Sequence, residues 1–262
     1  MRPETRHFKL TIAYDGTAYG GWQMQPNRVS VQSLIEGALA KLAGGRVVLH
    51  GSGRTDAGVH ACAQIASFTA ALPHTTTTIL RALNANLPED VRVFRVQEVA
   101  AGFHARFSAK KKEYRYQIDV GAVADPFQRR YAWHQPRPLD LAAMRQAARR
   151  LVGRHDFTAL SAKSERDPVR TISRLSITQC GQMLTIAVVA DGFLYKMVRT
   201  IVGSLVKVGE GKLSPAGLVE ILAARKRTAL IETAPAHGLF LWRVSYPTGT
   251  ASRRGSRGSA SR

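Results

Sequence analysis

The stretch GSGRTDAGVHA, residues 51–61, is the most informative part of this 262-residue chain. Three glycines surround Arg54 and Asp56, and glycine permits positive φ and the close approach of another backbone. The residues on either side, 46–50 and 61–69, predict two strands joined by this glycine-rich loop. A carboxylate held in such a loop can face a ligand, but the same spacing is also typical of a hairpin turn with a structural Arg–Asp pair.

Two common nucleotide-binding motifs are excluded for this chain. The phosphate-loop pattern G-x-x-x-x-G-K-[ST] is absent, because the Gly-Lys pair at 211–212 is followed by Leu213. The dinucleotide fingerprint G-x-G-x-x-G is not met by the loop either, because Asp56 stands where its last glycine should be. The loop is therefore not expected to hold a nucleotide in either of these ways.

Outward from the loop, strands and helices follow one another without a regular β-α-β repeat. Further strands are expected at 8–14, from 91 onward, and at 113–118, 172–178, 183–190 and 239–246. Helices are expected at 31–42, 79–85, 141–151, 196–208 and 215–224, with Ser30, Asp140 and Ser214 as N-caps. This pattern predicts an α+β fold of two similar halves, with a mixed, largely antiparallel sheet flanked by helices and a central basic cleft. The halves are predicted at 1–105, which carries the Asp loop, and 106–247.

Composition excludes several classes of protein. Hydrophobic residues make up 45% of the chain, which excludes a wholly disordered protein. Two cysteines, Cys62 and Cys180, are too few for a disulfide scaffold or for a zinc site of four thiolates. The longest stretch without charged residues, 57–80, contains Pro73 and His74 and does not suit a membrane span, and the first ten residues lack an apolar signal core. We expect a soluble, cytoplasmic protein without a bound metal.

Positive charge is the main feature of the composition. Lys and Arg number 38 against 18 Asp and Glu, which gives a formal net charge of +20 and favours a polyanionic partner. Residues 248–262 contain four arginines and almost no apolar residue, so they are predicted to form a disordered basic tail. In the rest of the chain, lysines and arginines cluster with aromatic residues, as they do on RNA-binding surfaces. Each of these cations taken alone is also explained as a solvated surface charge. The candidate RNA contacts are Lys110, Lys111, Lys112, Arg149 and Arg150.

The segment GRTDAGVHA closely resembles the signature of the tRNA pseudouridine synthases of the TruA type. The resemblance covers most of the chain in the family's order, and no motif position departs from it. The Asp segment is highly specific, and the other blocks are individually moderate. Those blocks are FKLTIAYDGTAYGGWQMQP (8–26), ALNANLPEDVRV (82–93), FHARFSAKKKEYRYQI (103–118), DPVRTI (167–172), DGFLYKMVRTIVGSLVKVG (191–209) and APAHGLFLWRVSY (234–246).

The resemblance implies an isomerase that converts uridine to pseudouridine at positions 38, 39 and 40 of the tRNA anticodon arm, without a metal or organic cofactor. It implies that Asp56 is the nucleophile, that Tyr114 is the active-site tyrosine, and that Arg199 pairs with the catalytic carboxylate. It also implies a homodimer acting on tRNA. Arg54 is expected to support the site by contacting phosphate or helping to extrude the nucleotide, with a loop-bracing role as the alternative.

Two other functions stay open at this point. A non-catalytic RNA-binding protein would explain the basic surface equally well. A metal-dependent nuclease or phosphatase would need Asp15, Asp56 and Asp156 to act together, and the sequence shows no closely spaced carboxylate cluster to favour it. The residues also leave two routes for Asp56, which are attack on C6 of the base and assistance at the ribose while uracil departs.

Overall fold

A computed structural model describes residues 4–164 and 166–247 of the chain, so the predicted tail at 248–262 lies outside the described residues. The elements run in chain order as β1 (Arg6–Tyr14), α1 (Val31–Ala43), β2 (His50–Gly51), β3 (His60–Ala70), α2 (Thr76–Asn86), β4 (Val91–Glu98), β5 (Lys111–Asp119), β6 (Trp133–His134), α3 (Leu141–Arg150), β7 (Gly153–Asp156), η1 (Thr158–Leu160), β8 (Val169–Cys180), β9 (Met183–Ala190), α4 (Met197–Gly209), α5 (Pro215–Ala224), η2 (Ala236–Gly238) and β10 (Leu239–Ser245). The α+β fold is confirmed. None of the described helices is both long and apolar enough to cross a lipid bilayer.

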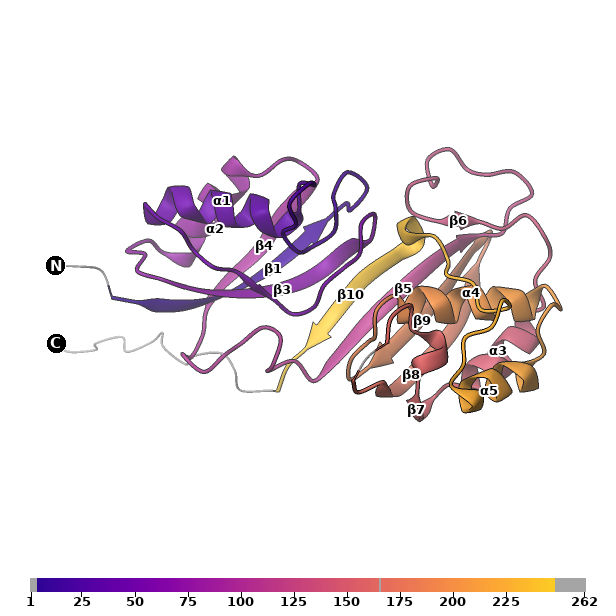
Figure 1. The fold of residues 1–262 in the computed structure, drawn as a ribbon. Helices are drawn as coiled ribbons and strands as arrows, with labels where there is room; N and C mark the ends of the chain where they lie inside the picture. The colour runs from indigo at the N-terminus through magenta and orange to yellow at the C-terminus, as the bar shows by residue number, and fades with distance from the viewer. Residues whose placement is uncertain (1–3, 165, 248–262) are drawn as a thin grey trace, which may run out of the picture.

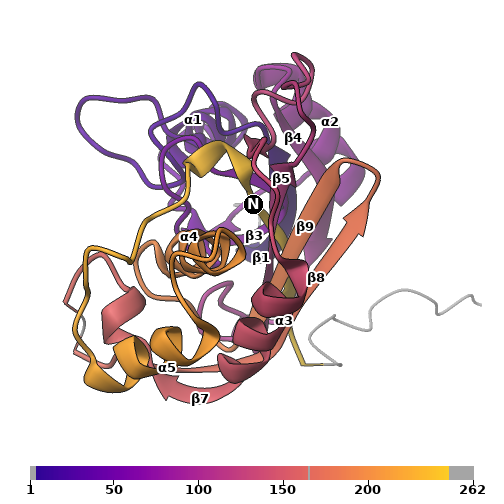
Figure 2. The same cartoon turned by 90° about the vertical axis from the view of Figure 1, so that its right-hand side faces the viewer.

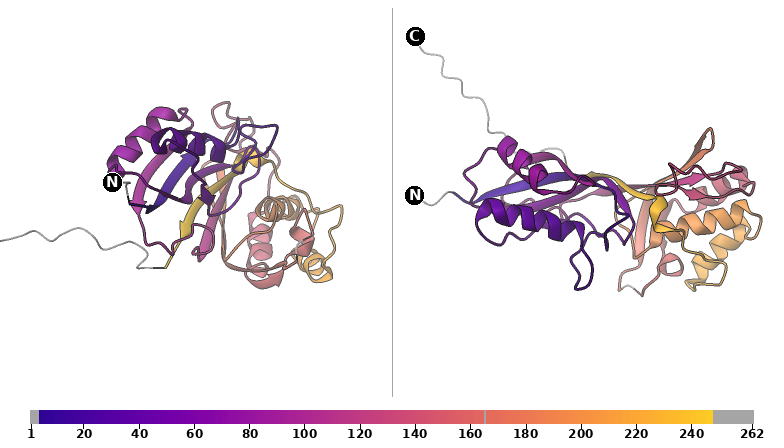
Figure 3. Two further views of the ribbon diagram at one scale, coloured as in Figure 1. Left: turned by 60° about the vertical axis from the view of Figure 1, so that its left-hand side comes forward. Right: turned by 90° about the horizontal axis from the view of Figure 1, so that it is seen from above.

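One ten-stranded sheet runs through the whole molecule in the order β4-β1-β3-β10-β5-β9-β8-β7, with β2 and β6 at its margin. Its pairs are antiparallel except for β10 with β3 and β5 with β6, as expected for a largely antiparallel sheet. Figure 1 shows α1 and α2 beside the strands of the first half and α3, α4 and α5 beside those of the second. Viewed from above in Figure 3, the two groups of helices lie at opposite ends of the sheet.

Strand β10 joins the two halves, although it is the last strand of the described residues. It pairs in parallel with β3 through Phe240 and Leu241, and antiparallel with β5 along most of its length. The buried apolar side chains form one continuous cluster that includes Phe8 of the first half, Leu241 of β10 and Ile186 of the second half. Figure 2 shows the helices of the second half in front, with α1 and α2 of the first half farther back and higher in the view. The division at 105/106 stays a prediction, and the sheet itself is continuous.

The helix starts follow from the capping side chains expected in the sequence. Ser30, Asp140 and Ser214 each accept a hydrogen bond from a backbone N–H in the first turn of α1, α3 and α5. Helix α1 ends at Gly44, which adopts the left-handed conformation with φ of 65°. These caps are local, and a local pattern is sufficient to predict them.

One expected strand needs correction, and two short strands were missed. Residues 46–50 were predicted as a strand, but only His50 pairs, together with Gly51, in the two-residue strand β2. Val47 and Leu49 are nevertheless buried, so the apolar pattern of this segment reflects core packing without a strand ladder. Strands β6 and β7 were not predicted, because each is too short to show an alternating pattern.

Helix α4 lies unusually close to the segment that precedes η2. A Cβ added to Gly203 would lie 2.3 Å from the carbonyl oxygen of Glu232, so only glycine fits at this position of the helix. The close approach allows the Ala234 N–H to donate to the carbonyl of Arg199 at 3.0 Å. Gly203 therefore sets the position of the helix that carries Arg199.

Replacing Gly203 by Ala is expected to lower the free energy of unfolding by about 1–3 kcal/mol, because the methyl group must displace packed backbone. Gly37→Ala is the matched control, because Gly37 lies in α1 with nothing within 4 Å of an added Cβ. That change should stabilise the protein by about 0.5–1 kcal/mol through helix propensity. Urea unfolding followed by circular dichroism measures both, and equal effects of the two substitutions would contradict the packing argument.

Candidate active site

A cleft of about 740 Å³ lies where the loop of residues 51–59, strand β5 and the start of α4 meet. It is the central basic cleft expected from the sequence, because among residues 4–164 and 166–247 many cations line it and Asp56 is its one carboxylate. The cations that line the cleft are Arg54, Arg106, Lys112, Lys163, Arg170, Lys196 and Arg199. Such an excess of positive charge in a concave surface attracts an anionic ligand.

Asp56 and Arg199 form an ion pair within the cleft. The Arg199 Nη1 atom donates to Asp56 Oδ2 at 3.0 Å, across 143 positions of sequence. The Arg199 Nε atom donates to the carbonyl of Ala234 at 2.8 Å, so the guanidinium is held at two points. The Asp56 side chain is 24% exposed and the Arg199 side chain 13% exposed, so the carboxylate is shielded and still reachable from the cleft. A planar guanidinium fixed in this way orients the carboxylate as well as neutralising it.

The loop that carries Asp56 is fixed by contacts from three other segments. The Thr55 hydroxyl bonds to the Tyr14 hydroxyl at 2.8 Å, and the Thr55 carbonyl accepts the Trp22 N–H at 3.1 Å. Gly21 adopts a φ of 99°, and a Cβ there would lie 2.4 Å from the Thr55 carbonyl oxygen. Gln64 of β3 closes the loop from the other side by donating to the Gly53 carbonyl at 2.8 Å. A loop supported in this way holds its carboxylate in one position.

Tyr114 of β5 forms part of the wall of the cleft, as the sequence suggested. The residue is buried, and its ring meets the edge of Phe193 with centroids 5.1 Å apart at 87°. Burial, followed by the neighbouring Tyr14 and Asp56, raises the pKa of Tyr114 well above its usual range. Its hydroxyl therefore stays neutral at physiological pH. The hydroxyl has no hydrogen-bond partner among residues 4–164 and 166–247, which leaves it free for a ligand.

Of the five candidate RNA contacts, only Lys112 lines the cleft. Burial, and then the charges of Arg106 and Arg170, lowers the pKa of Lys112 to about 8. Its ammonium group lies beside Gly53, where a Cβ would be 3.1 Å from Nζ. The other candidates, Lys110, Lys111, Arg149 and Arg150, are exposed and lie outside the lining of the cleft. Arg54 is also exposed, but it does line the cleft.

Several residues of the cleft were missed by sequence reasoning. Lys163 and Lys196 both lie over the ring of Tyr195, at 4.8 and 5.2 Å from its centroid. Arg170 reaches the cleft from the start of β8. Arg170 and Lys196 belong to blocks quoted for the resemblance, which was the only signal for them. Lys163 lies outside every block, so nothing in the sequence marked it.

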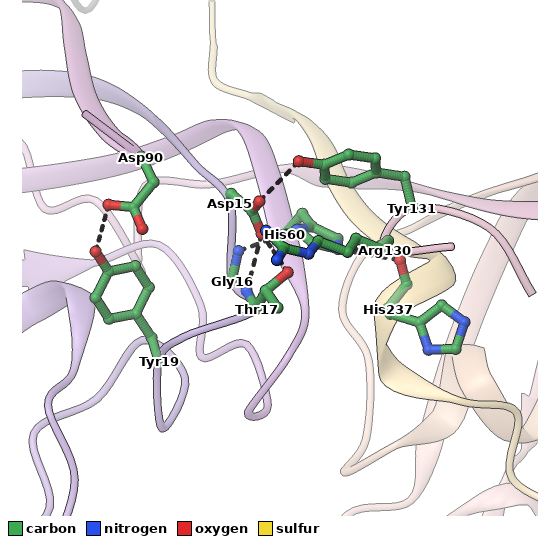
Figure 4. Close-up of polar contacts among 9 residues, drawn as sticks. All are labelled: Asp15, Gly16, Thr17, Tyr19, His60, Asp90, Arg130, Tyr131 and His237. Carbon is green, nitrogen blue, oxygen red and sulfur yellow. Dashed lines mark hydrogen bonds and ion pairs between the residues drawn. The ribbon is translucent and has the colours of Figure 1, made fainter. Parts of the chain in front are cut away.

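Behind the cleft, His60 connects the loop to three other segments (Figure 4). The Gly16 N–H and Asp15 Oδ1 both lie against His60 Nδ1, at 3.0 and 3.1 Å. The opposite nitrogen, Nε2, lies 3.0 Å from the carbonyl oxygens of both Arg130 and His237. The ring is 1% exposed. These buried contacts give His60 a structural role.

Asp15 stands beside His60 and is committed to partners of its own. The Tyr131 hydroxyl donates to Asp15 Oδ2 at 2.8 Å, and the N–H and hydroxyl of Thr17 donate to Oδ1 (Figure 4). Burial alone would raise the pKa of Asp15, but these hydrogen bonds outweigh it and lower the pKa. Asp156 lies on β7 and pairs with Arg225 at 3.2 Å. The three aspartates of the nuclease hypothesis therefore lie in separate networks. Among the described residues, no group of three or more His, Cys, Asp or Glu side chains could hold a metal ion.

Comparison with known proteins gives a consistent result. A family model described as tRNA pseudouridine synthase matches residues 10–108 and 147–247. Proteins named tRNA pseudouridine synthase A are similar over nearly their whole length. The protein from Brevibacillus brevis is 49% identical over 243 residues, covering 92% of this chain and 100% of its own. Those from Geobacillus kaustophilus and Thermotoga neapolitana are 48% and 46% identical, over 92% of this chain and 95% and 100% of theirs.

Replacing His60 by Ala is expected to lower the free energy of unfolding by about 1–3 kcal/mol, because it leaves buried backbone groups without partners. His74→Ala is the control, because that side chain is exposed and should leave stability within about 0.5 kcal/mol. Thermal unfolding measures both variants. Equal melting temperatures would show that His60 does not hold these segments together.

Proposed function

This chain belongs to the tRNA pseudouridine synthase family, and we propose that it isomerises uridines 38, 39 and 40 of the tRNA anticodon arm. Asp56 is the proposed nucleophile, and the reaction needs no cofactor. The observation that supports the proposal is the Asp56–Arg199 ion pair, because it places a carboxylate in a cleft that seven lysines and arginines line. We further propose that the enzyme acts as a homodimer in the cytoplasm.

The isomerisation conserves atoms, which is why a single carboxylate suffices. The bond between N1 of uracil and C1′ of the ribose breaks, the uracil rotates, and C5 bonds to C1′. The proton on C5 is lost and N1 gains one, so uridine and pseudouridine have the same composition. Asp56 acts either by adding to C6 of the base or by assisting at the ribose while the uracil anion departs. Both routes need an ionised carboxylate aimed at the nucleotide.

Arg199 supports both routes by aiming Asp56. Its Nη1 atom donates to the carboxylate at 3.0 Å, and the planar guanidinium fixes the direction of this charge-assisted hydrogen bond. Phe193, Leu194 and Met197 form an apolar wall beside the pair, which strengthens their attraction by excluding water. Because the guanidinium is also bonded to Ala234, its position does not depend on the substrate.

Tyr114 is the proposed platform for the target base. Its ring is held by Phe193, and its neutral hydroxyl can exchange a proton or donate a hydrogen bond to the uracil. A uridine within a stem must leave the stack to reach this ring, at a cost of a few kcal/mol. Binding of the tRNA phosphates by the cations of the cleft offsets that cost, with Arg54 at the exposed side of the loop.

The central test replaces Asp56 by Asn, which keeps the shape of the side chain and removes its charge. Pseudouridine formation on tRNA transcripts should fall by at least about 10⁴-fold, as for loss of other covalent nucleophiles. Affinity for tRNA should change less than about threefold, because phosphate contacts dominate binding. Mapping pseudouridine by position in the product tests positions 38, 39 and 40 in the same experiment.

Asp156→Asn is the matched control, because Asp156 lies outside the cleft and pairs with Arg225. This variant should keep wild-type turnover. An Asp56→Asn enzyme that still turns over would refute the nucleophile assignment. A wild-type chain that binds tRNA without changing it would favour the non-catalytic RNA-binding protein instead.

Lys112 should make tRNA affinity depend on pH. Its pKa of about 8 in the free protein rises when a phosphate lies nearby, so binding takes up a proton above pH 8. Affinity should therefore fall by about tenfold between pH 7 and pH 9 at constant salt. Lys112→Gln should remove this dependence, whereas Lys111→Gln, an exposed neighbour outside the cleft, should keep it. Fluorescence anisotropy with labelled tRNA measures the three proteins, and a pH-dependent Lys112→Gln variant would refute the assignment.

A further inference from the structure

One wall of the cleft carries a row of three aromatic rings, His50, His104 and Phe107, which we call the ring ladder. The centroids of His50 and His104 are 5.0 Å apart at 35°, and those of His104 and Phe107 are 4.4 Å apart at 34°. All three residues line the same cleft as Asp56. None of them is used by the chemistry proposed above, so the ladder needs an explanation of its own.

The ladder is held in place by the backbone of its own segment. The N–H groups of Arg106 and Phe107 both point to His104 Nδ1, at 3.1 and 3.4 Å. The His104 N–H donates to the Ser108 hydroxyl at 3.1 Å, and the Ser108 N–H returns a bond to the His104 carbonyl at 2.9 Å. This compact turn fixes the His104 imidazole and leaves the Phe107 ring exposed.

The chemistry of the ladder suits a flat, uncharged ligand. Burial, followed by the charges of His50 and Arg106, lowers the pKa of His104, so its ring is neutral at physiological pH. Phe107 is 77% exposed, which leaves most of an apolar ring in contact with water. An exposed aromatic face inside a cleft marks a place where a ligand covers it. A nucleobase is the common ligand of that shape in a site rich in cations.

The charge around the ladder identifies the class of partner. The Arg106 guanidinium lies 5.6 Å from the centroid of the Phe107 ring, so a cation stands directly beside the exposed face. An apolar surface of another protein would have to meet the seven cations of the cleft opposite one carboxylate. RNA satisfies both features at once, because it presents unstacked bases and phosphates together.

We propose that the ring ladder is a second base-binding site, at which Phe107 stacks an unpaired nucleobase of the RNA substrate beside the flipped uridine. The proposal rests on the proposed function, because it takes RNA as the ligand of the cleft. It assigns Phe107 to binding of a neighbouring base and leaves the target base to Tyr114 and Asp56. Arg106 then neutralises the phosphate that links the stacked nucleotide to its neighbour. Stacking of this base on Phe107 holds the RNA loop open while the uridine reacts.

The test compares Phe107→Leu with Phe127→Leu in the full-length protein. Phe127 is 83% exposed and lies outside the cleft, so it controls for loss of an exposed ring. Kd for an anticodon stem-loop RNA is measured from 50 to 300 mM NaCl. Phe107→Leu should weaken binding by about 5- to 100-fold, as for loss of one base stack, with an unchanged salt slope because no counterion is involved. Phe107→Trp should retain wild-type affinity, and Phe127→Leu should match wild type.

A second arm identifies the base. Single abasic substitutions through the loop of the RNA should weaken wild-type binding at one position, and Phe107→Leu should lose nothing more at that position. Equal Kd values for Phe107→Leu and wild type would overturn the ladder, provided that wild type still forms pseudouridine. A changed salt slope for Phe107→Leu would indicate a phosphate contact and would also overturn the ring ladder. A Phe107→Leu variant with wild-type affinity and a changed oligomeric state would overturn it as well. A wild-type protein that neither binds nor modifies tRNA would instead refute the proposed function.

Discussion

The ion pair between Asp56 and Arg199 is the interaction on which the rest of this structure depends. Its two members belong to different halves of the molecule, and the sheet must be continuous for them to meet at 3.0 Å. Strand β10 provides that continuity, because it pairs with β3 on one side and β5 on the other. Gly203 completes the arrangement by allowing α4 to lie against the backbone that holds the Arg199 guanidinium. The last strand of the chain thus builds a site whose carboxylate lies near the beginning.

Charge in the cleft is unbalanced, and the imbalance has a physical consequence. Arg199 is paired with Asp56, and Arg170 lies 3.8 Å from Asp167, but among the described residues no other carboxylate lines the cleft. Burial, and then repulsion by Arg106 and Arg170, lowers the pKa of Lys112 to about 8. Repulsion of this kind is relieved when a polyanion enters. The charge of the free cleft therefore suits an RNA backbone, and Asp56 is the carboxylate to which we assign the proposed chemistry on the base.

How much of the fold and of the site could be predicted depends on how far apart in the sequence the interacting residues lie. The caps at Ser30, Asp140 and Ser214 are local, as are the alternating patterns of the strands at 172–178 and 183–190, and all of these were predicted from the sequence. The pairing of Asp56 with Arg199 came from the resemblance alone, because no spacing rule connects residues 143 positions apart. Strand order depends on pairing across the whole chain and was not predicted. Clustered charge in the sequence selected Arg149 and Arg150 as RNA contacts, but both lie on the exposed side of α3, outside the cleft. A cluster of charges in the sequence does not reveal which way its side chains face.

Different parts of the site need different degrees of rigidity. A carboxylate that reacts with a base must be held to within about 0.5 Å, and loops are usually too mobile for that. Here the loop is bonded to β1 through Tyr14, to the Trp22 segment through Thr55, and to three further segments through His60. The ring ladder makes no such demand, because every base offers a flat face and stacking tolerates small shifts. The proposed function needs this combination, because a rigidly held carboxylate beside an adaptable base-binding surface could act on neighbouring uridines in RNAs of different sequence.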